Sequence, residues 1–297
     1  MDFYFVGINA QHMQLVEERN ISIKPNLLYS MAYMTPKINS ALYKLKSKEV
    51  IGKLALDSGA FSLNSKSSYK IKPDALFNRF MWFAKYNIEL FDIIINFDIS
   101  FSPDSFDTNM KYPRQLEKER IYAWPVVHDY MSYEFKKFIN LGYENIAFGK
   151  GKQRTFPALF DGCIDSLING ASKVHMLGVG TPRILLNIPF TSADAKSALD
   201  YARYGIGIFV QGNHLEFIKF PQSKNDEDTS ESFQNKKHNY LKWLHSKGID
   251  IQWHELCGKK KCLFATVANM VCYAELEKKA SQQHIEIWKW LLIDKQS

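Results

Sequence analysis

The sequence has little cysteine and no long apolar run. Its 297 residues include 4 Cys, 10 Pro and 15 Gly, which excludes a disulfide-stabilised miniature protein and a collagen-like repeat. No apolar run approaches the roughly 18 residues of a membrane-spanning helix, and Met1–Gln11 lacks the basic segment of a signal peptide. We therefore expect a cytoplasmic protein without a membrane partner, whose cysteines are thiols or metal ligands.

Positively charged residues are in slight excess over negatively charged ones. The chain has 38 Lys and Arg residues against 31 Asp and Glu residues, a formal net charge of +7. A polyanionic partner such as nucleic acid is compatible with this excess, which does not by itself require one. Hydrophobic residues make up 46% and aromatic residues 14% of the chain, which predicts a sizeable core and excludes intrinsic disorder.

Short apolar segments recur up to Gln211, each followed by a polar turn and then a helix-like stretch. The predicted strands are Tyr4–Ile8, Leu54–Asp57, Ile93–Asp98, Tyr122–His128, Asn145–Gly149, Val174–Gly178, Phe190–Asp194 and Gly207–Gln211. Helices are predicted at Pro73–Ile88, Ser132–Leu141, Lys237–Gly248 and Lys261–Leu292. About eight strand–helix units favour an α/β fold, a (β/α)8 TIM-like barrel with a C-terminal helical extension. An open doubly wound sheet is the alternative.

Three parts are predicted along the chain. Residues 1–220 form the barrel core, residues 221–236 a polar flexible loop, and residues 237–297 a helical region that packs on the barrel. The loop is predicted because the segment PQSKNDEDTSESFQ is polar and acidic without periodicity. The sequence leaves open whether residues 1–50 supply the first barrel strand or a separate lid.

Three carboxylates end predicted strands. Asp57 closes LALD, Asp98 closes INFD and Asp194 closes FTSAD. Catalytic groups of such barrels lie at the C-terminal ends of the strands, so we expect these side chains to converge. Convergent acids raise one another's pKa values, which suits a nucleophile beside an acid/base and a hydrogen-bond acceptor. A helix cap is the alternative for Asp57.

These motifs occur in an order that resembles a known enzyme family. The segments DSGAF, NFD, PVVH, IAFG and MLGVGTP, followed by a strand-terminal Asp, are similar to motifs of the tRNA-guanine transglycosylase superfamily, which includes the queuine and archaeosine tRNA-ribosyltransferases. The match covers scattered motifs over about half the chain. DSGAFS and SADA resemble the short phage and bacterial relatives that insert 7-deazaguanines into DNA.

The resemblance implies a barrel pentosyltransferase that replaces guanine in nucleic acid, DNA in preference to tRNA, with a 7-deazaguanine such as preQ0 or a derivative. Exchanging one N-glycosidic bond for another requires no cofactor. The protein would act in the host cytoplasm if a phage encodes it, and a homodimer is left open. The alternatives are a tRNA substrate, a non-catalytic nucleic-acid-binding subunit on the same barrel, and an unrelated barrel hydrolase or aldolase whose acids hold a metal.

The resemblance also implies roles for individual residues. Asp194 is similar to the family nucleophile, which attacks C1′ and forms a covalent glycosyl–enzyme intermediate, and Asp57 to the general acid/base. The implied base-binding residues are Asp98, His128, Gly149, Ser58 and Gly59. Phe61 or Phe148 would stack on the base, with a core position as the alternative for either.

Basic residues follow two of the motifs assigned to the barrel mouth. The candidates for phosphate contacts around an extruded nucleotide are Lys66, Lys70, Lys150, Lys152 and Arg154. Simple solvation is the alternative for each of them.

A structural zinc site is the remaining possibility. The tRNA enzymes build theirs from closely spaced cysteines and a distant histidine, and the nearest candidates here are His254, Cys257, Cys262 and Cys272. Four N and S ligands suit structural zinc. A buried helical thiol is the alternative for Cys272, and the proposed chemistry needs no metal.

Overall fold

Eight strands form one parallel sheet in the computed structural model, which describes residues 1–60, 72–100, 105–130, 133–149, 155–211, 214–221, 228–258 and 262–293. They are β1 (Asp2–Val6), β2 (Asn26–Ser30), β3 (Leu54–Asp57), β4 (Ile93–Ile94), β5 (Val126–Val127), β6 (Asn145–Phe148), β7 (Lys173–Met176) and β8 (Ser192–Ala195). The spatial order is β4-β3-β2-β1-β8-β7-β6-β5. A parallel bridge between Ile95 and Trp124 joins the two ends, so the sheet closes. The predicted barrel is confirmed.

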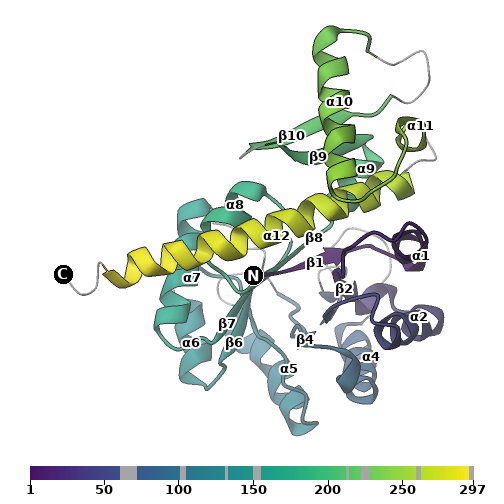
Figure 1. The fold of residues 1–297 in the computed structure, drawn as a ribbon. Helices are drawn as coiled ribbons and strands as arrows, with labels where there is room; N and C mark the ends of the chain where they lie inside the picture. The colour runs from purple at the N-terminus through teal and green to yellow at the C-terminus, as the bar shows by residue number, and fades with distance from the viewer. Residues whose placement is uncertain are drawn as a thin grey trace.

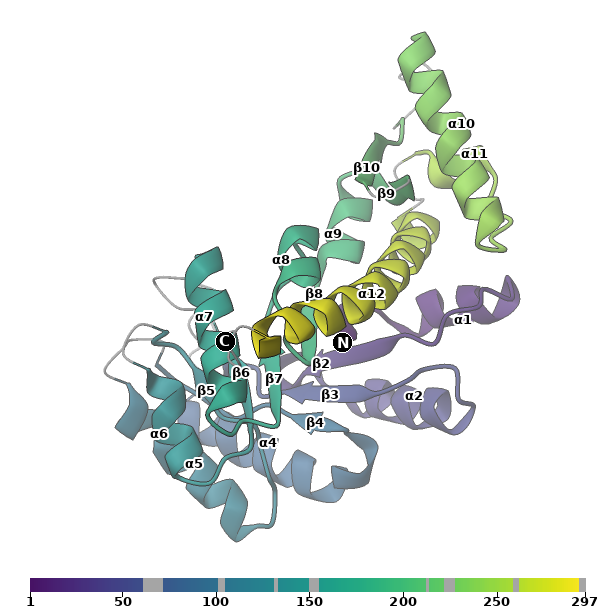
Figure 2. The same cartoon turned by 60° about the vertical axis from the view of Figure 1, so that its left-hand side comes forward.

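Helices surround the strands (Figures 1 and 2). They are α1 (Ala10–Glu18), α2 (Pro36–Ser47), α4 (Pro73–Tyr86), α5 (Phe106–Lys118), α6 (Glu134–Asn140), α7 (Phe156–Ile168), α8 (Pro182–Asn187) and α9 (Ser197–Arg203), with short 3-10 turns η1 (Met31–Tyr33) and η2 (Ile88–Leu90). Local sequence fixes several starts. Asn9 caps α1 by accepting from the N–H groups of Gln11 and His12, at 3.0 and 3.3 Å, and Thr35 caps α2 just before Pro36.

Alternating side chains divide the apolar residues between two cores. Because successive residues of a strand face opposite sides of the sheet, one set fills the barrel and the other packs beneath the helices. The interior cluster consists of Tyr4, Leu28, Ala55, Ile93, Ile95, Trp124, Val126 and Ala147. The outer cluster includes Phe3, Phe5, Leu54 and Leu56. The filled interior means that polar side chains at the strand ends lie at the mouth of the barrel.

The strand prediction needs two corrections. β2 was not predicted, because NLLYS is short and carries no period-2 signal, and residues 1–50 therefore supply two barrel strands rather than a separate lid. The prediction of Gly207–Gln211 as a barrel strand is wrong. β9 (Ile206–Gln211) instead pairs antiparallel with β10 (His214–Lys219) in a separate sheet. A short apolar run alone does not distinguish these two environments.

The described residues after this hairpin form α10 (Glu231–Ser246), α11 (Trp253–Leu256) and α12 (Cys262–Ile293). The predicted loop over 221–236 is wrong for residues 231–236, which belong to α10. The Ser230 side chain accepts from the N–H of Phe233 at 3.3 Å and so starts the helix early. Within the described ranges, none of the helices combines the length and apolar character that crossing a membrane requires.

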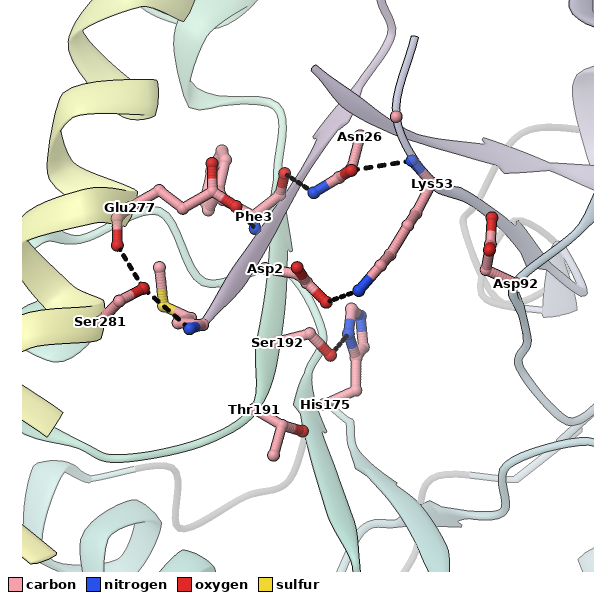
Figure 3. A network of polar contacts seen from close by, with 12 residues as sticks. Asp2, Phe3, Asn26, Lys53, Asp92, His175, Thr191, Ser192, Glu277 and Ser281 are labelled. Carbon is pink, nitrogen blue, oxygen red and sulfur yellow. Dashed lines mark hydrogen bonds and ion pairs between the residues drawn. The ribbon is translucent and has the colours of Figure 1, made fainter. Parts of the chain in front are cut away.

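The long helix α12 completes the outer helical layer. It contacts α1, α8 and α9 and packs on β1 (Figure 1). The rings of Tyr273 and Phe3 stack at 4.7 Å, and the Tyr273 hydroxyl donates to the carbonyl oxygen of Gly180 at 2.8 Å. In Figure 3 the Glu277 side chain extends from α12 to β1, where its Oε1 accepts from the N–H of Phe3 at 2.9 Å. The predicted packing of the C-terminal region on the barrel is confirmed for α12.

Replacing Tyr273 by Ala is expected to lower the free energy of unfolding by roughly 3 kcal/mol or more, because the change leaves a cavity beside Phe3 and removes a buried hydrogen bond. Tyr204→Ala is the matched control, since that ring is 75% exposed and should change stability by less than about 0.5 kcal/mol. Urea denaturation of both variants provides the measurement. Equal effects of the two substitutions would contradict the assigned role of α12.

Candidate active site at the carboxyl end of the barrel

A cavity of about 760 Å³ opens where the barrel strands end. Its lining includes Asp57, Asp98, His128, Gly149 and Asp194, which come from five different strand ends. The volume lies in the range typical of small-molecule sites. The structure therefore brings together the three aspartates that the sequence predicted to converge.

Asp57 ends β3 and is held by the turn that follows. The N–H of Gly59 donates to Asp57 Oδ2 at 3.1 Å. Burial raises the pKa of Asp57 to about 6; the nearby charges of Asp194 and Asp98 add to the rise, and the Ser30 hydroxyl and the Gly59 N–H oppose it. Asp57 can consequently exchange a proton near neutral pH, as a general acid/base must.

Asp194 lies on β8 with its two carboxylate oxygens in different situations. Oδ1 accepts from the N–H of Gly178 at 3.0 Å and contacts His175 Nε2 at 3.1 Å. No side chain or backbone group in the described part of the chain is hydrogen-bonded to Oδ2. This arrangement leaves one oxygen of the carboxylate available to a ligand.

Asp98 and His128 form a buried pair on the opposite side of the closed sheet from β8. Nε2 of His128 is in short hydrogen-bond contact with Asp98 Oδ2. The backbone behind the histidine is fixed by Glu134, whose Oε2 accepts from the N–H groups of His128 and Asp129 at 2.6 and 2.9 Å. Burial raises the pKa of Glu134. The pair offers the cavity a carboxylate and an imidazole of fixed orientation.

Gly149 makes room for this pair. A Cβ at position 149 would lie 2.5 Å from Val126 Cγ1 and 2.8 Å from His128 Cε1. The carbonyl oxygen of Gly149 accepts a hydrogen bond from the Tyr130 hydroxyl. Close approach of the Val126 and His128 side chains, rather than a turn, therefore requires glycine here.

Gly149→Ala is expected to displace His128 and with it Asp98, and to lower the free energy of unfolding by about 1–3 kcal/mol through overpacking. The affinity of the cavity for a ligand should fall by more than the lower fraction of folded protein accounts for. Gly142→Ala serves as the control for adding a methyl group, because a Cβ there meets nothing within 4 Å, although its φ of +90° adds strain of its own. Thermal melting and calorimetric titration of ligand measure both effects; unchanged ligand binding by Gly149→Ala would argue against the assignment.

Ser58 and Gly59 shape the turn after β3 and do not line the cavity. Ser58 is 1% exposed, and its Oγ accepts from the N–H of Ala60 at 3.4 Å. Gly59 has a φ of +80°, and a Cβ there would lie 2.7 Å from the backbone N of Ala32. Ser58 and Gly59 therefore shape the turn that holds Asp57 instead of lining the cavity themselves.

The two aromatic candidates for stacking differ in outcome. Phe148 is fully buried in the outer core, with its ring centroid 5.3 Å from that of Tyr130, which confirms the core alternative. Phe61 lies outside the described residues, as do the five candidate phosphate contacts Lys66, Lys70, Lys150, Lys152 and Arg154.

The four candidate zinc ligands do not come together. Among the described residues, which include all four, no three His, Cys, Asp or Glu side chains are placed to hold a metal ion. The physical reason is the helix α12, in which ten residues separate Cys262 from Cys272, a rise of about 15 Å. Cys272 is buried, and burial raises the pKa of its thiol. The prediction that His254, Cys257, Cys262 and Cys272 could form a structural zinc site is therefore wrong, because these residues do not come close enough together to bind one ion.

Sequence reasoning missed several residues of the site, among them His175, Tyr33 and Lys196. His175 lies within β7, where a polar residue between the apolar residues Val174 and Met176 was the available signal. Tyr33 lines the cavity with 64% of its surface exposed, and Lys196, two residues after Asp194, also lines it. Tyr33 belongs to η1 after the unpredicted strand β2, so its position was not foreseeable.

The fold and the position of the cavity define a (β/α)8-barrel protein with an acidic site at the carboxyl ends of its strands. No family model matches the chain, and no curated protein sequence matches it. Its function must accordingly be inferred from the site's own residues.

Proposed function

We propose that this protein is a base-exchange glycosyltransferase that replaces guanine in nucleic acid with a 7-deazaguanine through a covalent intermediate on Asp194. One observation carries the proposal: two carboxylates, Asp57 and Asp194, share a cavity but occupy different environments. Paired acids in different environments are typical of sites where one acts as a proton donor and the other as a nucleophile.

The first displacement follows from these environments. Oδ2 of Asp194 donates an electron pair to C1′ of the target nucleotide, and the C1′–N9 bond breaks with its electron pair passing to the purine. Protonated Asp57 transfers its proton to the purine, so guanine leaves as a neutral base. Asp57 is then a carboxylate, and the sugar is held on Asp194 as a glycosyl ester.

The second displacement reverses this sequence with a different base. The Asp57 carboxylate takes the proton from the entering 7-deazaguanine, whose ring nitrogen attacks C1′. The C1′–Oδ2 bond breaks and its electron pair returns to Asp194. Two inversions give retention of configuration at C1′. Asp57 ends protonated and Asp194 ends ionised, as they began. One N-glycosidic bond replaces another, so the exchange consumes no cofactor.

Recognition of the base is assigned to the opposite wall of the cavity. Asp98 can accept from the N–H edge of a guanine-like base, and His128 fixes the carboxylate that does so. Tyr33, exposed at the lining, offers a ring face for stacking. Because the cavity is concave, a target nucleotide must be flipped out of a duplex or already be single-stranded.

DNA is the favoured polymer, with tRNA as the alternative. The preference comes from the DSGAFS and SADA segments, which resemble those of DNA-modifying relatives, and is thus an analogy. A net charge of +7 is compatible with either polymer. Preferred entering bases are preQ0 or a derivative.

Incorporation of a labelled base tests the proposal directly. The protein is incubated with labelled guanine, and separately with labelled preQ0, in the presence of duplex DNA, single-stranded DNA or tRNA. We expect label to enter DNA in the absence of ATP and of added metal. Entry into tRNA alone would select the tRNA alternative, and no entry into any polymer would refute the base-exchange function.

A further inference from the structure

His175 is buried in the barrel interior directly beneath the proposed nucleophile. It lies on β7 opposite Ser192 of β8, and its side chain has no exposed surface. Ser192 and Asp194 are two residues apart on β8, so their side chains face the same side of the sheet. One imidazole therefore contacts both of them, with Nδ1 2.8 Å from Ser192 Oγ and Nε2 3.1 Å from Asp194 Oδ1. Figure 3 shows the His175–Ser192 contact.

These two contacts select a tautomer. An ionised carboxylate only accepts hydrogen bonds, so Nε2 of His175 carries the proton that it donates to Asp194. In the neutral ring Nδ1 is then the acceptor, and the Ser192 hydroxyl donates to it. Ser192 thus fixes the orientation in which His175 donates to Asp194.

Aromatic neighbours hold the imidazole ring in place. Tyr4 lies edge-on to it with ring centroids 5.8 Å apart and an interplanar angle of 75°, and Trp124 does the same at 6.5 Å and 84°. Both neighbours belong to the packed barrel interior. Rotation of the ring would disturb this packing, so the donor remains aimed at Asp194.

We propose that His175 is a positioning residue for Asp194, with Ser192 as its support, an inference that rests on the proposed function. His175 and the N–H of Gly178 both hydrogen-bond Oδ1 and so direct Oδ2 toward C1′. The same two donors remain on Oδ1 in the glycosyl ester. They stabilise the carboxylate that departs when the entering base attacks, so His175 serves both displacements.

Three variants test this role: His175→Phe removes the donor, His175→Gln keeps an amide N–H near the position of Nε2, and Ser192→Ala removes the support. Single-turnover formation of the protein–polynucleotide adduct is measured, together with polynucleotide affinity and Tm. We expect His175→Phe to slow adduct formation by about 10–100-fold at unchanged affinity. His175→Gln should recover at least about tenfold of that loss, and Ser192→Ala should slow the step severalfold.

The outcomes separate this inference from the function on which it rests. If the wild-type protein forms no adduct, the proposed function fails. If the wild type reacts and His175→Phe reacts as fast, or if His175→Gln is as slow as His175→Phe, the positioning role is overturned. Should His175→Phe not fold, an unchanged rate in Ser192→Ala at wild-type Tm would overturn it, and a severalfold slower rate at wild-type Tm would support it.

Discussion

Replacement of Asp194 by Ala is expected to abolish the covalent protein–polynucleotide adduct and to reduce base exchange by roughly 10⁴-fold or more, as for other nucleophile deletions. The reason is geometric as well as chemical. Oδ1 is engaged by Gly178 and His175, and Oδ2 is the oxygen left for attack. Trapping with 9-deazaguanine followed by denaturing electrophoresis measures the adduct.

Two comparisons make the Asp194 experiment decisive. Asp194→Asn keeps an oxygen that can accept from Gly178, so it should fold normally while failing to form the adduct. Asp161→Ala, on the outer helix α7 and exposed, removes a carboxylate far from the cavity and should react as the wild type does. An adduct retained in Asp194→Ala would show that another residue is the nucleophile.

Adduct formation is expected to slow about tenfold for each pH unit above about 6. In the proposed mechanism Asp57 must be protonated to release guanine as a neutral base, and burial raises the pKa of this carboxyl from 3.8 to about 6. Its protonated fraction therefore falls as the pH rises through that value. Transfer from the preformed intermediate to an entering base needs the carboxylate form and should show the opposite trend, rising up to about pH 6. Rapid-quench kinetics on each half-reaction measure the two limbs.

Asp57→Asn is expected to slow adduct formation by roughly 10²–10⁴-fold and to remove the limb near pH 6. Its effect on stability has the opposite sign. The folded protein binds the Asp57 proton more tightly than the unfolded chain does. The contribution of Asp57 to the free energy of unfolding therefore falls as the pH rises from about 3.8 to about 6. A neutral Asn avoids that loss. Asp57→Asn should therefore melt at a higher temperature than the wild type at pH 8 and show no such gain at pH 4; the same gain at both pH values would contradict a raised pKa.

The barrel could be predicted because most of its strands carry a recognisable local sequence pattern. Apolar runs ended by an acid and followed by a turn, such as Leu54–Asp57, specify a buried strand without reference to the rest of the chain. The hairpin strand β9 has an equally apolar sequence, IGIFV, and only its antiparallel partner β10 distinguishes it. Pairing partners are a property of the whole fold, which is why the eighth barrel strand was placed at Gly207–Gln211 instead of at β2.

Some residues of the candidate site could likewise be predicted from local sequence, whereas others depend on the tertiary structure. Asp57, Asp98 and Asp194 could be predicted because parallel strands of a closed sheet end at a common face. The contact of His175 with Asp194 could not, because it depends on the register between β7 and β8. Gly149 lines the cavity, but the crowding by Val126 and His128 that requires glycine there depends on side-chain packing that no single segment reveals.

The contact between α12 and β1 has a consequence for biosynthesis. Phe3 is hydrogen-bonded to Glu277, 274 positions away (Figure 3). The amino group of Met1 is hydrogen-bonded to Ser281, 280 positions away. On a ribosome β1 is made before the other described strands, but α12, the helix that covers it, is made only after all of them. Contacts between residues so far apart in sequence slow folding. The apolar face of β1 therefore stays exposed until α12 has been synthesised, and this exposed surface is of the kind that a chaperone binds during synthesis.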